Sequence, residues 1–316
     1  MVDLKAFSDD VNLEVSTILA SDFSIEVTST NSVPHSDDAA ITFPNLDSKS
    51  QGTKTIETTV LYIDMRRSTE LSLKHKRHTV AKLYSAFVRA MTRCAGIYGG
   101  EVRGIIGDRV MVIFNKENCF TNAVNTAILM SSVCQKIINK HFKHNEVTFG
   151  IGIDYGTILA TKTGIRRNGS AKGSYRSLVW LGRPANIASK LTDNANKPAE
   201  RVTLDKVIVK FGSGLGTYSQ EYYTVEFVKQ FYFNASTGRM HHFNPLFHSF
   251  RIESKIETLK EATPPILMTD DVYKGYKAAN PTAPEIQNGW WKLQDKIKDY
   301  SGDIYGGDVI FNYIQG

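Results

Sequence analysis

Two short apolar runs that each meet an aspartate constrain the fold of this chain most strongly. The first run ends in Leu61–Asp64, and the second crosses a turn at Gly107–Asp108. Each run has the length and composition of a strand. A carboxylate at a strand end projects into a cleft instead of a core. Two such carboxylates on neighbouring strands form a site for divalent cations on a triphosphate.

The segments around these aspartates alternate between strand and helix patterns. We predict a strand at 58–64, a helix at 69–98, a hairpin at 101–114, a helix at 118–142, a hairpin at 147–163 that turns at Gly156, a strand at 174–181 and a helix at 184–192. The order β-α-β-β-α-β is typical of the ferredoxin-like or palm fold. In this α+β architecture, helices lie on one face of a mainly antiparallel sheet.

The rest of the chain divides by composition. Residues 1–57 are predicted to hold an N-terminal helix and a polar arm, and residues 58–201 form the catalytic core. Residues 202–263 are rich in aromatic and polar side chains, which indicates an insertion. Residues 264–316 are predicted to complete the core and add a C-terminal extension.

Net charge and cysteine content indicate what kind of molecule this protein binds and in which cellular compartment it occurs. A net charge of +6 and a pI of about 9.0 fit a nucleotide or another anionic partner. The three cysteines lie in apolar stretches without a CxxC pair, which favours the reducing cytoplasm. No apolar run approaches the roughly 20 residues of a membrane span. Together with the predicted cation site on a triphosphate, these features lead us to expect a nucleoside triphosphate as partner, and neither a nucleic acid nor a membrane.

The loop after Asp64 has the features of a phosphate-binding turn. A strand that turns into a helix N-terminus presents backbone amides, and the helix dipole attracts phosphate. Arg66 and Arg67 are expected to add charge-assisted contacts, beside Ser68 and Thr69.

Several motifs, in the right order, resemble the class III nucleotidyl cyclases. They are Thr59–Asp64, Gly99–Val102, Gly107–Asp108, Phe149–Gly156 and Gly182–Leu191. The resemblance covers residues 58–196 and 264–280. It implies that Asp64, Asp108 and the main chain of Ile63 or Met65 hold two Mg²⁺ or Mn²⁺ ions. It also implies attack of the ribose 3′-oxygen on the α-phosphorus, with release of pyrophosphate.

The same resemblance assigns roles to Asn186 and Lys190. Asn186 matches the family's ribose-orienting Asn, and Lys190 stands where an Arg usually stabilises the charge on the reacting phosphate. Lysine keeps the charge but loses the bidentate fork. In the family these residues and the metal pair come from opposite subunits, which implies a homodimer with shared sites. Lys190 also supports the alternative of a catalytically inactive cyclase-like module that dimerises or binds nucleotide.

The residues that usually read a purine are missing. Adenylate cyclases of this class use a Lys four residues before the second metal Asp and an Asp seven residues before the Asn; these positions are Gly104 and Val179 here. Guanylate cyclases use Glu and Cys there. Because a base normally meets polar partners in its site, both purine activities are disfavoured, and adenylate cyclase stays an alternative. A shift of one residue brings Arg103 into the base-reading position.

Tyr62 shares a strand face with Asp64. It is either an ordinary core aromatic or a bulky group that narrows the base pocket to a single ring. These features look like the pyrimidine cyclases of bacterial Pycsar antiphage systems. That resemblance implies cyclic UMP made from UTP upon phage infection, and a separate effector that responds to the messenger. Cyclic CMP made from CTP is the alternative.

Overall fold

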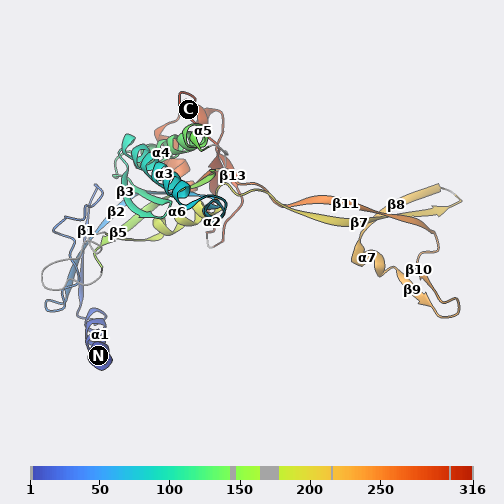
Figure 1. Cartoon of the computed structure of the whole chain (residues 1–316), viewed down its shortest axis with the longest axis horizontal. Helices are drawn as coiled ribbons and strands as arrows, with labels where there is room; N and C mark the ends of the chain where they lie inside the picture. Colours follow the sequence, from blue (N-terminus) through green and yellow to red (C-terminus); the bar gives the residue numbers. More distant parts are fainter. Residues whose placement is uncertain (1–2, 143–146, 164–177, 215, 299, 315–316) are drawn as a thin grey trace. The chain divides into compact units, whose positions relative to one another are not determined.

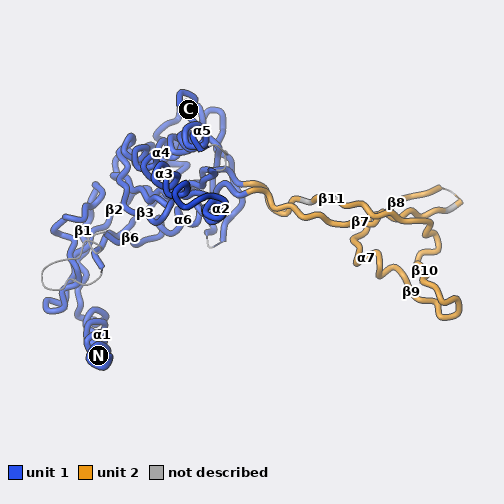
Figure 2. The backbone as a smooth tube through the Cα atoms, in the orientation of Figure 1, with its two compact units in different colours: residues 1–197, 263–316 blue, residues 198–262 orange. Residues whose placement is uncertain are grey.

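The chain divides into two compact units. A computed structural model describes residues 3–142, 147–163, 178–214, 216–298 and 300–314. One unit is Met1–Lys197 with Thr263–Gly316, and the other is Pro198–Ala262 (Figure 2). The second unit covers nearly the same residues as the predicted insertion at 202–263.

A mainly antiparallel sheet, with nine strands among the described residues, forms the centre of the first unit (Figure 1). Its order is β13-β14-β12-β5-β2-β4-β3, with β1 beside β2 and β6 beside β5. The strands are β1 (Ser24–Ser29), β2 (Ser50–Met65), β3 (Glu101–Ile106), β4 (Arg109–Ile113), β5 (Phe149–Thr161), β6 (Val179–Leu181), β12 (Ile266–Thr269), β13 (Lys292–Gln294) and β14 (Ile304–Gly307). The α+β architecture predicted from the motif order is confirmed.

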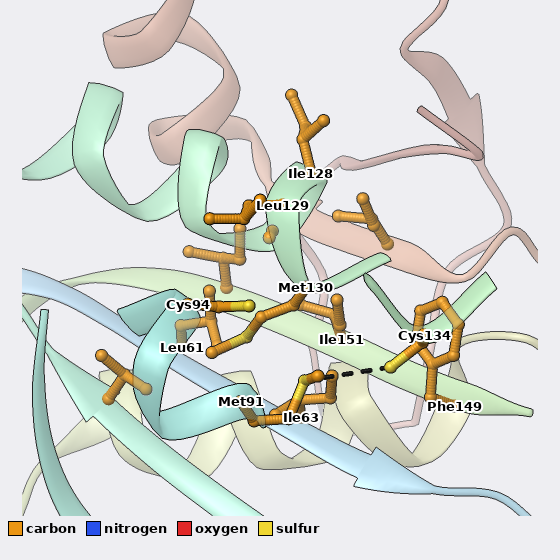
Figure 3. Close-up of a cluster of buried hydrophobic side chains, with 14 of the residues drawn as sticks. Leu61, Ile63, Met91, Cys94, Ile128, Leu129, Met130, Cys134, Phe149 and Ile151 are labelled. Carbon is orange, nitrogen blue, oxygen red and sulfur yellow. Dashed lines mark hydrogen bonds between the residues drawn. The ribbon is translucent and has the colours of Figure 1, made fainter. Parts of the chain in front are cut away.

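Helices that include α3 and α4 cover one face of this sheet. The helices of the first unit are α1 (Leu4–Ile18), α2 (Ser68–Lys74), α3 (Arg77–Ile97), α4 (Cys119–Val133), α5 (Asn139–His141), α6 (Arg183–Asn194), α8 (Asp270–Ala279) and α9 (Pro284–Gln287), with a π-helical turn η1 (Cys134–Ile138). Leu61 and Ile63 of β2 pack with Met91 of α3 and Ile128 of α4 in the main core (Figure 3). Among the described residues, no helix is long and apolar enough to cross a membrane.

Helix α6 packs on the opposite face, so the prediction of helices on one face only was wrong. Val60 of β2 and Met111 of β4 contact Ala185 and Ala188 of α6. Successive residues of a strand point to opposite faces, and both Val60 and Leu61 are fully buried. The apolar run in β2 therefore reflects a strand covered on both sides.

Strand β2 starts at Ser50, eight residues before the predicted start at 58, and β1 pairs with it in parallel. The predicted polar arm thus contains two strands. The start of β2 lacks a recognisable strand pattern because its buried polar side chains bond to residues far away in the sequence. The buried Gln51 amide donates to Thr161 Oγ1 at 2.8 Å and to the Lys162 carbonyl at 2.7 Å.

Two further predictions need correction. The predicted hairpin at Gly156 is one continuous strand, β5, because β2 is long enough to pair with both halves, from Met65 opposite Phe149 to Lys54 opposite Ala160. The predicted helix at 69–98 is divided into α2 and α3, since Lys76 adopts an extended conformation. Residues 174–177 of the predicted strand at 174–181 lie outside the described residues.

The second unit has its own small core. Strands β7 (Glu200–Ser213), β8 (Gly216–Tyr223) and β11 (Phe247–Lys260) form a sheet of order β11-β7-β8. Helix α7 (Thr224–Val228) and a hairpin of β9 (Phe231–Asn234) and β10 (Arg239–His242) complete it. Val207, Val209, Phe211 and Phe227 form its cluster of buried hydrophobic side chains.

The contact between α6 and β5 gives a prediction about stability. A Cβ atom at Gly152 would lie 2.2 Å from the Ala188 carbonyl oxygen and 2.4 Å from the Thr192 nitrogen. Gly152→Ala is expected to lower the free energy of unfolding by about 1–3 kcal/mol, because the backbone of α6 must move. Chemical denaturation measures this loss. Gly96→Ala is the control, since a Cβ there meets nothing within 4 Å. Equal stability of the two variants would contradict the tight α6–β5 packing.

Candidate active site

The pairing of β2 with β4 brings Asp64 and Asp108 together. Ile63 pairs with Val110, so Asp64 follows the last residue of β2 that pairs with β4, and Asp108 precedes β4. The two-residue turn before β4 starts at Gly107, whose φ of 63° suits glycine. Burial and the neighbouring Asp64 carboxylate raise the pKa of Asp108, while the backbone amides of Asp108 and Met65 oppose that rise. The two carboxylates therefore share one partly buried site.

This carboxylate pair has the chemistry of a cation site. The residue Asp108 is only 9% exposed, and its Oδ2 atom is buried without a hydrogen-bond partner in the described part of the chain. Leaving a buried acceptor unsatisfied costs about 1–3 kcal/mol, which a cation ligand would recover. The described residues contain no metal-binding group of three or more His, Cys, Asp or Glu side chains. Main-chain and substrate oxygens would thus have to complete the coordination.

Of the two main-chain candidates, Met65 fits better than Ile63. Ile63 is paired with Val110 on one side and with Ile151 on the other. Met65 pairs with Phe149 only and lies beyond the last β2–β4 pair. The Met65 main chain is therefore less enclosed by the sheet.

Arg109 is a site residue that the sequence analysis missed. Its Nε and Nη2 atoms donate to Asp64 Oδ2 at 3.1 and 2.8 Å. Nη1 donates to Ser189 Oγ at 2.9 Å, and Nη2 also bonds to Asp193. Ser189 and Asp193 are one turn apart on α6. The adjacency of Arg109 to Asp108, together with this helical spacing, is the sequence signal that could have revealed the group.

The loop after β2 holds two arginines in different environments. Arg66 donates its backbone N–H to the Thr148 carbonyl at 2.7 Å, and its buried Nε and Nη2 atoms have no hydrogen-bond partner among the described residues. Burial lowers the pKa of Arg66, and the charges of Asp64 and Asp193 oppose this. Arg67 is exposed and forms an ion pair with Glu70 at 2.7 Å. Ser68 and Thr69 open the short helix α2. Arg66 is therefore the arginine available to a buried anion.

Tyr62 belongs to a row of residues across the sheet. It pairs with Gly152 on β5 and with Met111 on β4, and Met111 pairs with Gly104 on β3. The Tyr62 hydroxyl donates to the Met111 sulfur at 3.1 Å. Burial raises the pKa of Tyr62. The Tyr62 ring is thus held on the sheet face that carries Asp64. In the same row, Gly104 contributes no side chain.

A β-bulge places Arg103 beside this row. The register shifts between the pairs Val102–Val112 and Gly104–Met111, so Arg103 is the extra residue. Two successive residues, Arg103 and Gly104, then face the same side. An ion pair with Glu101 at 3.3 Å holds Arg103, and its buried Nε has no partner among the described residues. Counting along the sequence could not detect this shift.

The remaining predicted residues lie on α6 and β6. Asn186 is exposed, and Lys190 follows one helical turn later on a neighbouring part of the α6 surface. Val179 starts β6 and pairs with Thr161, at a different point on β5 from Gly152. Neighbouring Trp180 packs against the same apolar cluster as Tyr62.

Comparison with known proteins found relatives along much of the chain. A uridylate cyclase of Burkholderia cepacia is 30% identical over 209 residues, 63% of this chain and 85% of that protein. A uridylate cyclase of Xanthomonas perforans is 34% identical over 144 residues, 44% of this chain and 59% of that protein. A cytidylate cyclase of Staphylococcus aureus is 29% identical over 162 residues, 48% of this chain and 36% of that protein.

Solved structures and a family profile were compared as well. The crystal structure of an adenylyl cyclase from P. aeruginosa matches with a TM-score of 0.46 and 16% identity, over 80% of this chain and 94% of that chain. The profile described as "Adenylate and Guanylate cyclase catalytic domain" matches residues 50–241. That match spans the two aspartates, the row of Tyr62 and helix α6, and it includes β2 from its first residue. The chain belongs to the family of class III nucleotidyl cyclases.

Proposed function

We propose that this protein is a pyrimidine nucleotide cyclase that converts UTP to 3′,5′-cyclic UMP and pyrophosphate. The observation that carries the proposal is the row of Tyr62, Met111 and Gly104, with Arg103 added by the bulge. Where a purine-specific cyclase of this class has a charged base reader, Gly104 has no side chain. The names of the uridylate cyclases among the relatives support the same substrate class.

Arg103 favours uracil over cytosine on chemical grounds. A guanidinium group has donors only. Uracil presents the O4 acceptor at the position where cytosine presents an N4 amino donor. The buried Nε of Arg103 lacks an acceptor among the described residues, so a uracil oxygen would satisfy it. Two donors facing each other would instead leave both unsatisfied, which costs binding energy.

The residues around Asp64 would handle the triphosphate. Asp64, Asp108 and the Met65 main chain fit two Mg²⁺ or Mn²⁺ ions, which when bound supply charge neutralisation and activation of the 3′-hydroxyl. The Arg66 guanidinium lies near the Asp64 charge, and its buried Nε and Nη2 have no partner among the described residues, so they fit phosphate oxygens. Asn186 would orient the ribose and Lys190 would face the reacting phosphate from a second copy of the chain. The cyclic nucleotide would act as a messenger to a separate effector in antiphage defence.

The substrate assignment predicts the outcome of an assay with four nucleotides. The purified protein, given Mn²⁺ and ATP, GTP, CTP or UTP separately, is expected to yield cyclic UMP as its main product. Separation of the products by liquid chromatography with mass detection measures this. Cyclic CMP as main product would move the assignment to CTP. Cyclic AMP alone would overturn the pyrimidine assignment, and no product from any nucleotide would favour the inactive module.

The role of Arg103 predicts a change in base preference. Arg103→Gln is expected to lower kcat/KM for UTP about 10- to 100-fold, the loss of a hydrogen bond to a charged donor, with a smaller effect on CTP. Initial rates with both nucleotides measure the ratio. Glu101→Gln is the matched control, because it breaks the same ion pair and keeps the guanidinium. An unchanged UTP-to-CTP ratio in Arg103→Gln would contradict base reading by this residue.

The shared site predicts complementation between inactive variants. Asp108→Asn and Asn186→Ala are each expected to lose at least about 99% of the activity, because each removes one half of every site. Co-expressed in equal amounts, they should restore about a quarter of wild-type activity, since half of the dimers carry one intact site. Each variant expressed alone is the control. A mixture as inactive as its parts would argue against sites shared between subunits.

A further inference from the structure

Arg109 bridges the aspartate pair to helix α6. Its guanidinium bonds to Asp64 through two nitrogens, at 3.1 and 2.8 Å, and reaches Ser189 and Asp193 on the opposite side. The Arg109 side chain is 25% exposed, that of Asp64 is 17% exposed and that of Asp193 is 53% exposed. The guanidinium of Arg109 therefore connects the carboxylate of Asp64 on β2 with that of Asp193 on α6.

A divalent cation and this guanidinium compete for the same oxygen. Both bonds from Arg109 to Asp64 end on Oδ2. A cation on Asp64 would also repel Arg109, and this repulsion is strong where water is largely excluded. Asp108 receives no such bond, and its Oδ2 has no partner among the described residues. The Arg109 contact thus covers Asp64, one of the two expected cation ligands. The charge of the other, Asp108, has no cationic partner in this contact.

Helix α6 already offers Arg109 a second position. Asp193 bonds to Nη2 and Ser189 accepts from Nη1. A guanidinium released from Asp64 would keep both contacts, so its charge would remain paired. An arginine without that alternative would have to face water or stay on Asp64.

We propose that Arg109 is a displaceable counter-ion that occupies the cation position in the metal-free protein and moves onto Asp193 when a cation binds. This inference rests on the proposed role of Asp64 as a cation ligand. Arg109 stabilises the metal-free aspartate pair and lowers its affinity for divalent cations. Asp193 acts as the receiving group and raises that affinity. Arg109 is thus a positioning residue that sets the cation concentration at which the site fills.

The test uses the whole chain without nucleotide. Isothermal titration calorimetry measures its affinity for Mn²⁺, and thermal unfolding measures its melting temperature without metal. Arg109→Met is expected to lower the melting temperature of the metal-free protein and to tighten Mn²⁺ binding roughly 10-fold, a typical size for coupled sites. Arg89→Met is the matched control. It removes the same charge from an exposed position on α3, which covers the other face of the sheet. Unchanged or weaker Mn²⁺ binding in Arg109→Met would overturn the proposal.

A double-mutant cycle separates the receiving role of Asp193 from its charge. Asp193→Asn is expected to weaken Mn²⁺ binding in the wild-type background and to have little further effect in Arg109→Met. An equal effect in both backgrounds would mean that Asp193 acts through its charge alone, which would overturn its receiving role. If Arg109→Met does not fold, Arg109→Lys replaces it, because lysine keeps the charge but lacks the guanidinium fork that donates to Asp64 through two nitrogens. Lysine should also tighten Mn²⁺ binding, and failure to do so would count against the proposal.

Asp108→Asn distinguishes failure of this inference from failure of the proposed cation site. It should weaken Mn²⁺ binding strongly in the wild-type background. If it does so while Arg109→Met leaves the affinity unchanged, the cation site stands and the counter-ion role falls. If Asp108→Asn binds Mn²⁺ as the wild type does, the cation site itself is wrong and the counter-ion role falls with it.

Discussion

The pairing of β2 with β4 is the constraint on which the rest of the site depends. It ends at Ile63 and Val110, so Asp64 and Asp108 lie beside each other just beyond the last β2–β4 pair. The row of Tyr62, Met111 and Gly104 follows from the same register, because a shift of one residue would turn every side chain to the other face. Helix α6 can approach this face because Gly152 leaves room for its backbone. Register and packing thus determine the positions of the aspartate pair and of this row together.

Without a bound cation, only one of the two aspartates in the site is paired with a positively charged group of the described residues. Asp64 is paired with Arg109, whereas Asp108 has a raised pKa and an oxygen without a partner in the described residues. Arg66 has two buried donor atoms, Nε and Nη2, without an acceptor among the described residues, and an anion would satisfy them. A cation bound with a triphosphate would compensate both groups. These unsatisfied groups support the proposed binding of a metal–nucleotide complex.

The sequence was informative where chemistry is local and less so where partners are distant. The aspartates, the turn at Gly107 and helix α6 were predicted because strand ends, glycine turns and helical spacing are visible in short windows. The start of β2 at Ser50 was missed because Gln51 finds its partners beyond residue 160. The continuity of β5 through Gly156 depends on the length of its neighbour. The bulge at Arg103 leaves no periodic signal in the sequence, and Arg109 was missed because its contacts join separate elements.

The central claim is that Asp64 and Asp108 jointly hold the cations that accompany a pyrimidine triphosphate. Electron paramagnetic resonance can count the Mn²⁺ ions bound in the presence of a non-cyclisable UTP analogue that lacks the 3′-hydroxyl. We expect two ions per site in the wild type and a loss of bound Mn²⁺ in both Asp64→Asn and Asp108→Asn. Wild-type Mn²⁺ binding in either variant would contradict it.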